Sequence, residues 1–427
     1  MSVLAGNAWI AILAFVLVYS IIVSEKIHRT KIALVGAVVL IFAGIHDQEG
    51  AVAKVDFNTL GLLIGMMIIV AIAMRTGMFE YMAVRLAKKA QGNPARIMTA
   101  FFTFTAVTSA FLDNVTTVLL VTPIVFSVTA VLKVNPIPFL ISEVLASNIG
   151  GTATLIGDPP NIMIGGATGL GFNDFVINLT PVIIVVGFVT NWLFLMFYRK
   201  QLVATPDAQQ RIMDLDENSY LRDTVLLKKV LFVLAITIAG FVAHKALGFE
   251  SATIAMSGAA VLLLVAGIEP EEIFREVEWN TIFFFIGLFI LVGGLEVTGV
   301  IKLIAQIGLD ITHSDPMLMN FLILWLSAIA SAFIDNIPFV ATMIPLIKSI
   351  GQISGMDISS LWWALSLGAC LGGNGTVIGA SANVVVSAIA AGKGYPMAFV
   401  SYMKVAFPMM LVSIIICHVY IYFVYLR

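Results

Sequence analysis

Charge is scarce in this chain. Only 11% of its 427 residues are Asp, Glu, Lys or Arg, against roughly a quarter in an ordinary soluble domain. Because so few charges cannot solvate a globule of this size, and because 60% of the residues are hydrophobic, a soluble enzyme is excluded. The formal net charge of -2 also excludes a basic nucleic-acid binder. The composition predicts a polytopic protein of the lipid bilayer.

Cysteine and histidine are equally sparse. The two cysteines, Cys370 and Cys417, both lie in apolar runs, which excludes a disulfide scaffold and a multi-cysteine metal cluster. The five histidines are scattered without ligand spacing. A phosphate-binding loop of the form Gly-x-x-x-x-Gly-Lys-Ser/Thr is missing, so the chain itself is not expected to use ATP. We expect no cofactor.

Apolar runs of membrane-spanning length recur along the chain, and each is predicted to be a helix because backbone polar groups find no water in a bilayer. The predicted crossings are 4–23, 32–45, 57–74, 139–170 (interrupted), 174–198, 230–247, 253–267, 280–297, 361–391 (interrupted) and 405–426. Two further stretches, 97–132 and 320–350, are about twice this length and are broken by Asp-Asn. They are predicted to be re-entrant hairpins.

The basic residues indicate the orientation of the crossings. If segment 24–31 is cytoplasmic, most of the 23 Lys and Arg residues fall on the inside, which predicts both termini outside and the polar linker 199–229 inside. On this layout Arg29 belongs to a cytoplasmic loop, and Glu143 is expected on a helix surface. We expect a multi-pass protein of a prokaryotic inner membrane.

The first half of the sequence recurs 222 residues later. Ser109-Ala-Phe-Leu-Asp-Asn114 returns as Ser331-Ala-Phe-Ile-Asp-Asn336, and Gly150-Gly151 returns as Gly372-Gly373. Apolar helices resemble one another by chance, but polar and glycine motifs at one register indicate a duplication.

The number of segments predicts how the two copies are oriented. Each half holds five crossings and one hairpin, and an odd number of crossings inverts the second copy. The predicted fold is all-α, with two inverted-topology repeats (1–198 and 230–427), a cytoplasmic linker (199–229) and unwound helices at the midplane. This is the architecture of secondary transporters, and a channel is the alternative.

Asp113-Asn114 and Asp335-Asn336 lie in the middle of the apolar hairpins. An ionised carboxylate is costly there unless it faces water, a cation or the bundle interior. Each Asp could also serve as the N-cap of the second hairpin arm. The depth and the duplication favour a functional role.

The segment Gly150 to Asn161 cannot be a continuous helix, because Asp158 is followed by two prolines. Its carboxylate, hydroxyls and freed carbonyls are hard oxygen ligands suited to Na⁺ or to a proton relay. The repeat partner of Asp158 is Ala380, so the first half is predicted to carry the coupling ion.

The candidate residues form two sets. The predicted ion-coupling residues are Asp113, Asn114, Asp158, Thr152 and Thr154, with Na⁺ a candidate ligand of the first three. The predicted substrate-binding residues are Asn148, Asn161, Asp335, Asn336, Asn374, Thr376, Asn383, Ser109 and Ser331.

The hairpin motifs and the Ala146 to Asn161 segment resemble the ion transporter superfamily, in particular its ArsB, NhaD and pink-eyed-dilution P protein branch. The resemblance covers essentially the whole chain. It implies inverted repeats with scaffold and transport parts, elevator-type movement, and ion coupling by Asp113, Asn114 and Asp158. ArsB members exchange arsenite or antimonite for protons, and NhaD members exchange Na⁺ for protons.

The predicted function is proton-coupled efflux of arsenite or antimonite, because a neutral trihydroxide suits a site rich in Asn, Thr and Ser. Na⁺/H⁺ antiport is the second candidate. An intramembrane aspartyl protease is a remote third candidate, because it also uses buried Asp residues. Such an enzyme needs two carboxylates that share a proton. We therefore expect a transporter and no enzyme. The sequence leaves open a homodimer and an ATPase partner.

Overall fold

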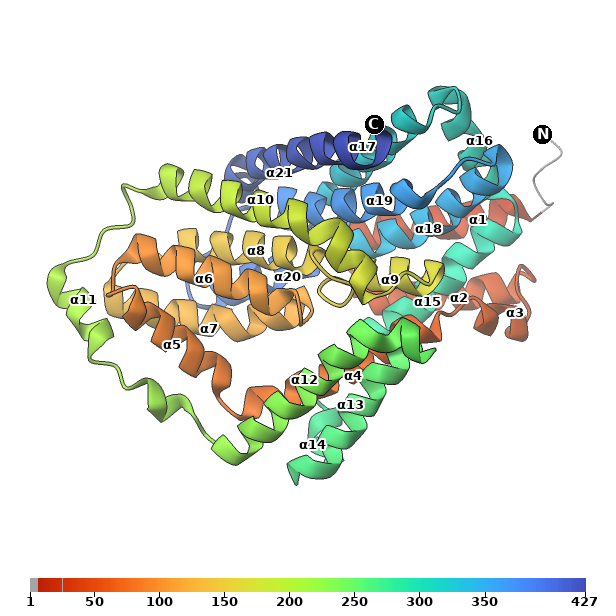
Figure 1. The fold of residues 1–427 in the computed structure, drawn as a ribbon. Coiled ribbons are helices and arrows are strands. Elements are labelled where there is room, and N and C mark those ends of the chain that lie inside the picture. The colour runs from red at the N-terminus through yellow and green to blue at the C-terminus, as the bar shows by residue number, and fades with distance from the viewer. Residues whose placement is uncertain (1–6, 25) are drawn as a thin grey trace.

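The computed structural model describes residues 7–24 and 26–427 as a bundle of helices (Figure 1). The first half comprises α1 (Ala8–Ser24), α2 (Arg29–Phe42), α3 (Gln48–Ala53), α4 (Phe57–Arg75), α5 (Met78–Lys89), α6 (Pro94–Ser109), α7 (Asn114–Leu132), α8 (Ile137–Thr152), α9 (Pro159–Thr168) and α10 (Phe172–Tyr198). The connection carries α11 (Pro206–Met213) and the 3₁₀ turn η1 (Glu217–Tyr220).

The second half follows the same order. It comprises α12 (Thr224–Leu247), α13 (Ser251–Ala266), α14 (Pro270–Phe274), α15 (Trp279–Val297), α16 (Val300–Thr312), α17 (Pro316–Phe333), α18 (Asn336–Ser354), α19 (Ser359–Gly372), η2 (Gly373–Gly375), α20 (Ser381–Gly392), α21 (Phe399–Ile421) and the terminal turn η3 (Tyr422–Leu426).

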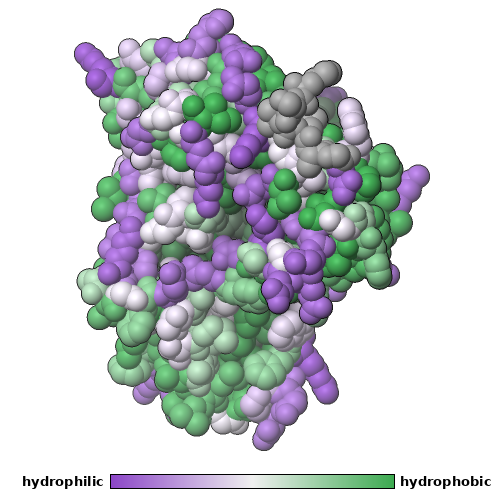
Figure 2. All heavy atoms as spheres, turned by 90° about the vertical axis from the view of Figure 1, so that its right-hand side faces the viewer, coloured by the Kyte–Doolittle hydropathy of each residue, from purple (hydrophilic) through white to green (hydrophobic). Residues whose placement is uncertain are grey.

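The surface of the bundle is that of a multi-pass membrane protein. Eight helices in the described part of the chain are long and apolar enough to cross a bilayer. Large apolar side chains point outward from several of them, such as Phe188 on α10, Phe232 on α12 and Leu264 on α13, which is 84% exposed. Figure 2 shows apolar residues dominating the lower part of one end of the molecule, at the height where Figure 1 draws α12 and α13. Such a surface is stable against lipid.

The predicted breaks in the apolar runs are turns in the structure. Asp113 begins α7 and accepts a hydrogen bond from the Thr116 amide, and Asp335 begins α18 and accepts one from Ile337. These side chains satisfy amides that a helix start leaves free. The expected interruptions are present as well, between α8 and α9 and between α19 and α20.

The helices repeat at the offset seen in the sequence. α4 and α15 have the same length and start 222 residues apart, as do α7 and α18. Packing between the halves is reciprocal. α2 packs on α15, and their repeat counterparts, α13 and α4, pack on each other. In the same way α7 packs on α20, and α18 packs on α9. Such exchanged pairs fit a two-fold relation between the halves. The inverted orientation itself stays a prediction.

Several boundaries differ from the sequence-based expectation, among them two helix starts. α12 begins at Thr224, inside the predicted linker, because the Asp223 carboxylate caps the amides of Val225 and Leu226. Arg29 is the first residue of α2, where the sequence suggested a loop residue. The Thr30 hydroxyl donates to the Asn280 carbonyl over 2.7 Å, which ties this helix start to α15.

Candidate functional site

Asp158 lies at the end of the unwound segment between α8 and α9 and is fully buried. It occupies the N-cap position of α9, but its carboxylate forms no capping hydrogen bond with that helix in the described structure. Two prolines follow it, so the first turn of α9 has fewer amides to cap. The Asp158 carboxylate is therefore free to bind something other than its own helix.

Amides from both halves of the chain surround this carboxylate. Asn114 Nδ2 donates to Asp158 Oδ1 over 3.2 Å, and Asn336 Nδ2 lies 3.4 Å from the same oxygen. The two asparagines begin α7 and α18, the second arms of the two hairpins. The structure thus brings the two duplicated Asp-Asn motifs together around Asp158, an acidic residue whose repeat partner is Ala380.

Asn148 extends the network into the second half. It accepts a hydrogen bond from Asn114 over 3.1 Å. Its own amide donates to Asn374 and Asn383, over 2.9 Å in each case. These side chains are at most 2% exposed. Four of the predicted residues thus form a continuous chain of amides across the interface between the halves.

Asn161 and Asn383 hold the two unwound segments in shape. Asn161 Nδ2 donates to the carbonyls of Thr152 and Thr154, and Asn383 Nδ2 donates to those of Gly373 and Thr376. Carbonyls released from a helix need such partners when they are buried. The Asn161 oxygen accepts from Ser366 over 2.6 Å, a contact that the sequence did not indicate.

The predicted hydroxyls bind backbone carbonyls. Ser109 donates to Ser147 over 2.7 Å and Ser331 donates to Ala369 over 2.6 Å, at equivalent places in the two halves. The remaining three hydroxyl groups do the same: Thr152 donates to Asn148, Thr154 to Ala110 and Thr376 to Ala332. The structure places these five side chains around the site, with their hydrogen atoms directed at the protein backbone.

The two hairpin aspartates have different partners. Asp113 binds the amide and hydroxyl of Thr116. Asp335 forms an ion pair with Arg29, whose Nη1 lies 2.5 Å from Asp335 Oδ2. Arg29 is not among the site residues predicted from the sequence, because a basic residue before an apolar run is typical of a cytoplasmic loop. A signal was available: an acid deep in an apolar hairpin needs a counter-ion.

The expectation for Glu143 was wrong. Glu143 is 1% exposed and lies inside the bundle, where it accepts a hydrogen bond from Thr122 over 3.0 Å. Its helix, α8, packs against α6, α7, α10 and α19, so every face of that helix is covered. The sequence of α8 has no distinct polar face, so it did not indicate on which side Glu143 would lie.

Three cavities follow α4 from one end to the other. A central one, about 10 Å³ in volume, contacts Leu63 and Met67 in the middle of α4 and is also lined by Asp113, Asn114 and Asn336. This volume is about what a single water molecule requires. A cavity of about 470 Å³ lies at the Arg75 end of α4, and one of about 240 Å³ lies at the Asp56 end.

The two outer cavities are counterparts in the repeat. Met67, Val70 and Glu278 line the first, and the residues 222 positions away, Phe289, Val292 and Asp56, line the second. Because the cavities lie at opposite ends of α4, the central cavity has a vestibule on either side. Met67 and Glu278 line both the central cavity and the vestibule at the Arg75 end.

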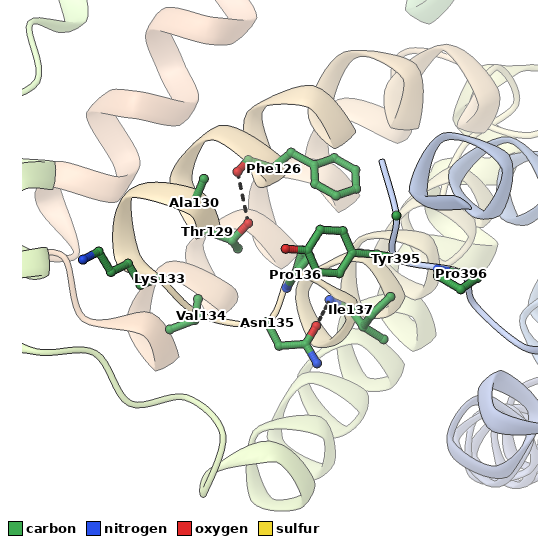
Figure 3. A pocket seen from close by; sticks show the side chains of 11 residues that line it. Phe126, Thr129, Ala130, Lys133, Val134, Asn135, Pro136, Ile137, Tyr395 and Pro396 are labelled. Atoms are coloured by element: carbon green, nitrogen blue, oxygen red, sulfur yellow. Dashed lines mark hydrogen bonds between the residues drawn. The ribbon is translucent and has the colours of Figure 1, made fainter. Parts of the chain in front are cut away.

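A further pocket of about 640 Å³ lies away from this site, at the turn between α7 and α8 (Figure 3). The Phe126 and Tyr395 rings lie 6.0 Å apart on one side of it, and Asn135 accepts a hydrogen bond from the Ile137 amide. None of the predicted site residues lines this pocket. It is not part of the Asp158 site.

Within residues 7–24 and 26–427, no three His, Cys, Asp or Glu side chains are grouped as a transition-metal site requires. Cys370 and Cys417 are free and buried. The groups around Asp158 are carboxylate, amide and hydroxyl, which suit a proton, a hard cation or a hydrogen-bonding solute.

Comparison with known proteins identifies the family. The citrate transporter family CitMHS matches residues 19–368 of this sequence. The chain belongs to the CitMHS family. Among its relatives in this family, an uncharacterized transporter of Mycobacterium bovis is 41% identical over 422 residues, covering 97% of this chain and 98% of that one. A 46 kDa membrane protein of Mycobacterium leprae is 40% identical over 425 residues, covering 98% and 99%.

More distant relatives extend the CitMHS comparison. The mouse P protein is 33% identical over 488 aligned residues, which cover 95% of this chain and 58% of the P protein. The solved structure of the Alcanivorax borkumensis YdaH transporter has the same fold, with a TM-score of 0.61, 14% identity and 98% coverage of both chains. The CitMHS chain is therefore a membrane transporter, and the resemblance to the P protein branch is supported. The ArsB assignment stays a prediction.

Proposed function

We propose that this CitMHS member is a proton-coupled secondary transporter in which Asp158 holds the proton and the transported solute in turn. The observation that carries the proposal is the environment of Asp158: a buried carboxylate that accepts hydrogen bonds from the side-chain amides of Asn114 and Asn336, one from each hairpin. A negative charge on the Asp158 carboxylate is costly in such an environment, so the carboxylate tends to take up a proton or to bind a cation. Proton and solute would therefore compete for one group, as exchange requires.

The two vestibules support alternating access. They lie at opposite ends of α4, and the central cavity between them is closed to about the size of one water molecule. Movement of the hairpin helices along α4 and α15 would open the centre to one vestibule at a time. This elevator-type movement, with inverted repeats, is part of the proposal.

Arsenite or antimonite is the first proposed solute, exported in exchange for protons. The uncharged trihydroxide donates and accepts hydrogen bonds, and Asn114, Asn148 and Asn336 offer uncharged partners beside Asp158. Citrate, named in the family description, needs unpaired cations. Arg29 is the basic residue that lines the central cavity, and it is paired with Asp335.

Na⁺/H⁺ antiport is the second candidate, favoured by the size of the central cavity. A space for one water molecule accepts a dehydrated Na⁺ without rearrangement, whereas a trihydroxide needs the hairpins to separate. The amide oxygens and Asp158 would supply the hard ligands. A protease is not proposed, because Asp158 forms hydrogen bonds with amides and not with a second carboxylate in the described part of the chain.

The test is proton flux in everted membrane vesicles with an imposed pH gradient, adding arsenite, antimonite, Na⁺, Li⁺ and citrate in turn. Arsenite-dependent or antimonite-dependent collapse of the gradient supports the first candidate, and collapse with Na⁺ or Li⁺ alone supports the second. The Asp158→Asn variant should lose the response, while Asp310→Asn, on α16 outside the site, should keep it. A response that survives in Asp158→Asn contradicts the proposal.

A further inference from the structure

The two hairpin tips are equivalent in sequence but not in charge. Asp113 and Asp335 occupy the same repeat position, and each caps the second arm of its hairpin. Asp113 Oδ2 is bound by the Thr116 hydroxyl of its own helix. Asp335 Oδ2 is bound by Arg29 from α2, a helix 306 residues earlier in the chain. Within residues 7–24 and 26–427, a fixed cation is therefore paired with only one of the two tips.

Three groups hold the Arg29 guanidinium at this position. Nη1 lies 2.5 Å from Asp335 Oδ2 and 2.6 Å from the Ser381 hydroxyl, and the guanidinium lies 4.9 Å from the centre of the Phe284 ring. The side chains of Arg29 and Asp335 are 26% and 14% exposed, so both have lost most of their contact with solvent. Carboxylate and hydroxyl oxygens at these distances are also what a hard cation would bind.

The first half lacks each of these features. The repeat partner of Arg29 is Ser251, and that of Ser381 is Pro159. Asp113, Glu278 and Arg29 all line the central cavity, and Arg29 is already paired with Asp335. In the described part of the chain Asp113 forms no ion pair, so the first hairpin tip presents a carboxylate to this cavity without a fixed counter-ion.

We infer that Arg29 is a tethered cation: its guanidinium occupies the position that a soluble cation would take at Asp335, so that only the first-half tip takes a cation from solution. The inference deepens the proposed function, because it assigns at most one soluble cation to each transport cycle. It also gives Arg29 a specific role, which is to neutralise Asp335 at the tip of the second hairpin.

The test counts bound ²²Na⁺ on the purified full-length protein at saturation. Arg29→Gln removes the tethered charge and should bind one Na⁺ more per chain than the wild type, whether the wild type binds one or none. Arg29→Gln combined with Asp335→Asn should return to the wild-type number. Arg29→Lys, which keeps a cation at this position, should also keep the wild-type number. An unchanged count in Arg29→Gln overturns the inference.

A second measurement tests the inference if Arg29→Gln folds too poorly to be purified. The melting temperature of Arg29→Gln in membranes should rise in NaCl relative to N-methylglucamine chloride, while that of the double variant should not. Equal melting temperatures of Arg29→Gln in the two salts contradict the inference. Failure of Arg29→Gln to accumulate in membranes in either salt, while the double variant does accumulate, contradicts it as well. Neither readout requires transport. A wild type without coupled flux would therefore refute the proposed function, whereas the number of bound Na⁺ ions would still test the role of Arg29.

Discussion

Asp158, Asp113 and Asp335 show how a carboxylate in a membrane protein acquires its role from its neighbours. Asp113 and Asp335 each accept a hydrogen bond from a backbone amide at a helix start, so both act as helix caps. Asp158 precedes two prolines and binds side-chain amides from elsewhere in the chain. The sequence places all three in apolar surroundings, but only the structure separates the two acids that cap a helix from the one that caps none.

Asn148 is expected to be a stabilising residue of the site. Asn148→Ala removes the donor to Asn374 and Asn383 and the acceptor of Asn114, leaving buried amides without partners. Each such loss costs about 1–3 kcal/mol. We expect a lower melting temperature of the purified variant together with reduced flux. A variant as stable as the wild type would show that the amide chain contributes nothing to folding.

At the scale of elements, α6 and α8 approach so closely that a side chain does not fit between them. A Cβ atom on Gly150 would lie 2.5 Å from the Ala106 Cα, whereas one on Gly187 would meet its nearest atom at 3.7 Å. Gly150→Ala should therefore lower the stability by about 1–3 kcal/mol through overpacking. Gly187→Ala, the matched control in α10, should be neutral or stabilising. Thermal unfolding of the two variants checks this, and equal melting temperatures would contradict it.

The linker is fastened to α5 by an ion pair whose pH dependence can be predicted. Lys88 Nζ lies 2.5 Å from Glu217 Oε2, and this hydrogen bond lowers the pKa of Glu217 below its usual value. Since the folded-state pKa is the lower one, the stabilisation is present above the unfolded value of about 4.3 and is lost as the pH falls through the folded value.

Hydrogen exchange of residues 214–222 measures this effect. Protection should fall as the pH is lowered through this range, after correction for the intrinsic exchange rate. Glu217→Gln, which cannot form the ion pair, should lose this part of the pH dependence. A wild type and variant with the same pH profile would show that the Lys88 contact does not hold the linker.

At the scale of the whole molecule, the predicted inversion of the halves can be tested at the vestibules. Met74 and Glu296 are repeat counterparts and line the cavities at opposite ends of α4. Labelling of Met74→Cys and Glu296→Cys by a membrane-impermeant maleimide should occur from opposite sides, Met74→Cys from the cytoplasm. The buried Cys370 and Cys417 should give little background in the wild type. Labelling of both variants from one side contradicts the inverted topology.

Much of the architecture could be predicted because its signals are local. Apolar length, the Asp-Pro-Pro break and the 222-residue offset predicted the helices, the unwound segments and the duplicated motifs. The partners of Arg29 and Glu143 could not be predicted, because each is fixed by tertiary packing. Arg29 meets Asp335 only after two distant helices pack, and Glu143 is buried because helices from both halves surround α8.

The central claim is that Asp158 exchanges a proton for the transported solute. Its most direct test is the proton release that follows addition of arsenite, antimonite or Na⁺ to the purified, weakly buffered protein, compared between the wild type and Asp158→Asn. The account predicts up to one proton released per wild-type chain and none from Asp158→Asn, with Asp310→Asn behaving as the wild type. Equal release from Asp158→Asn and the wild type would contradict it.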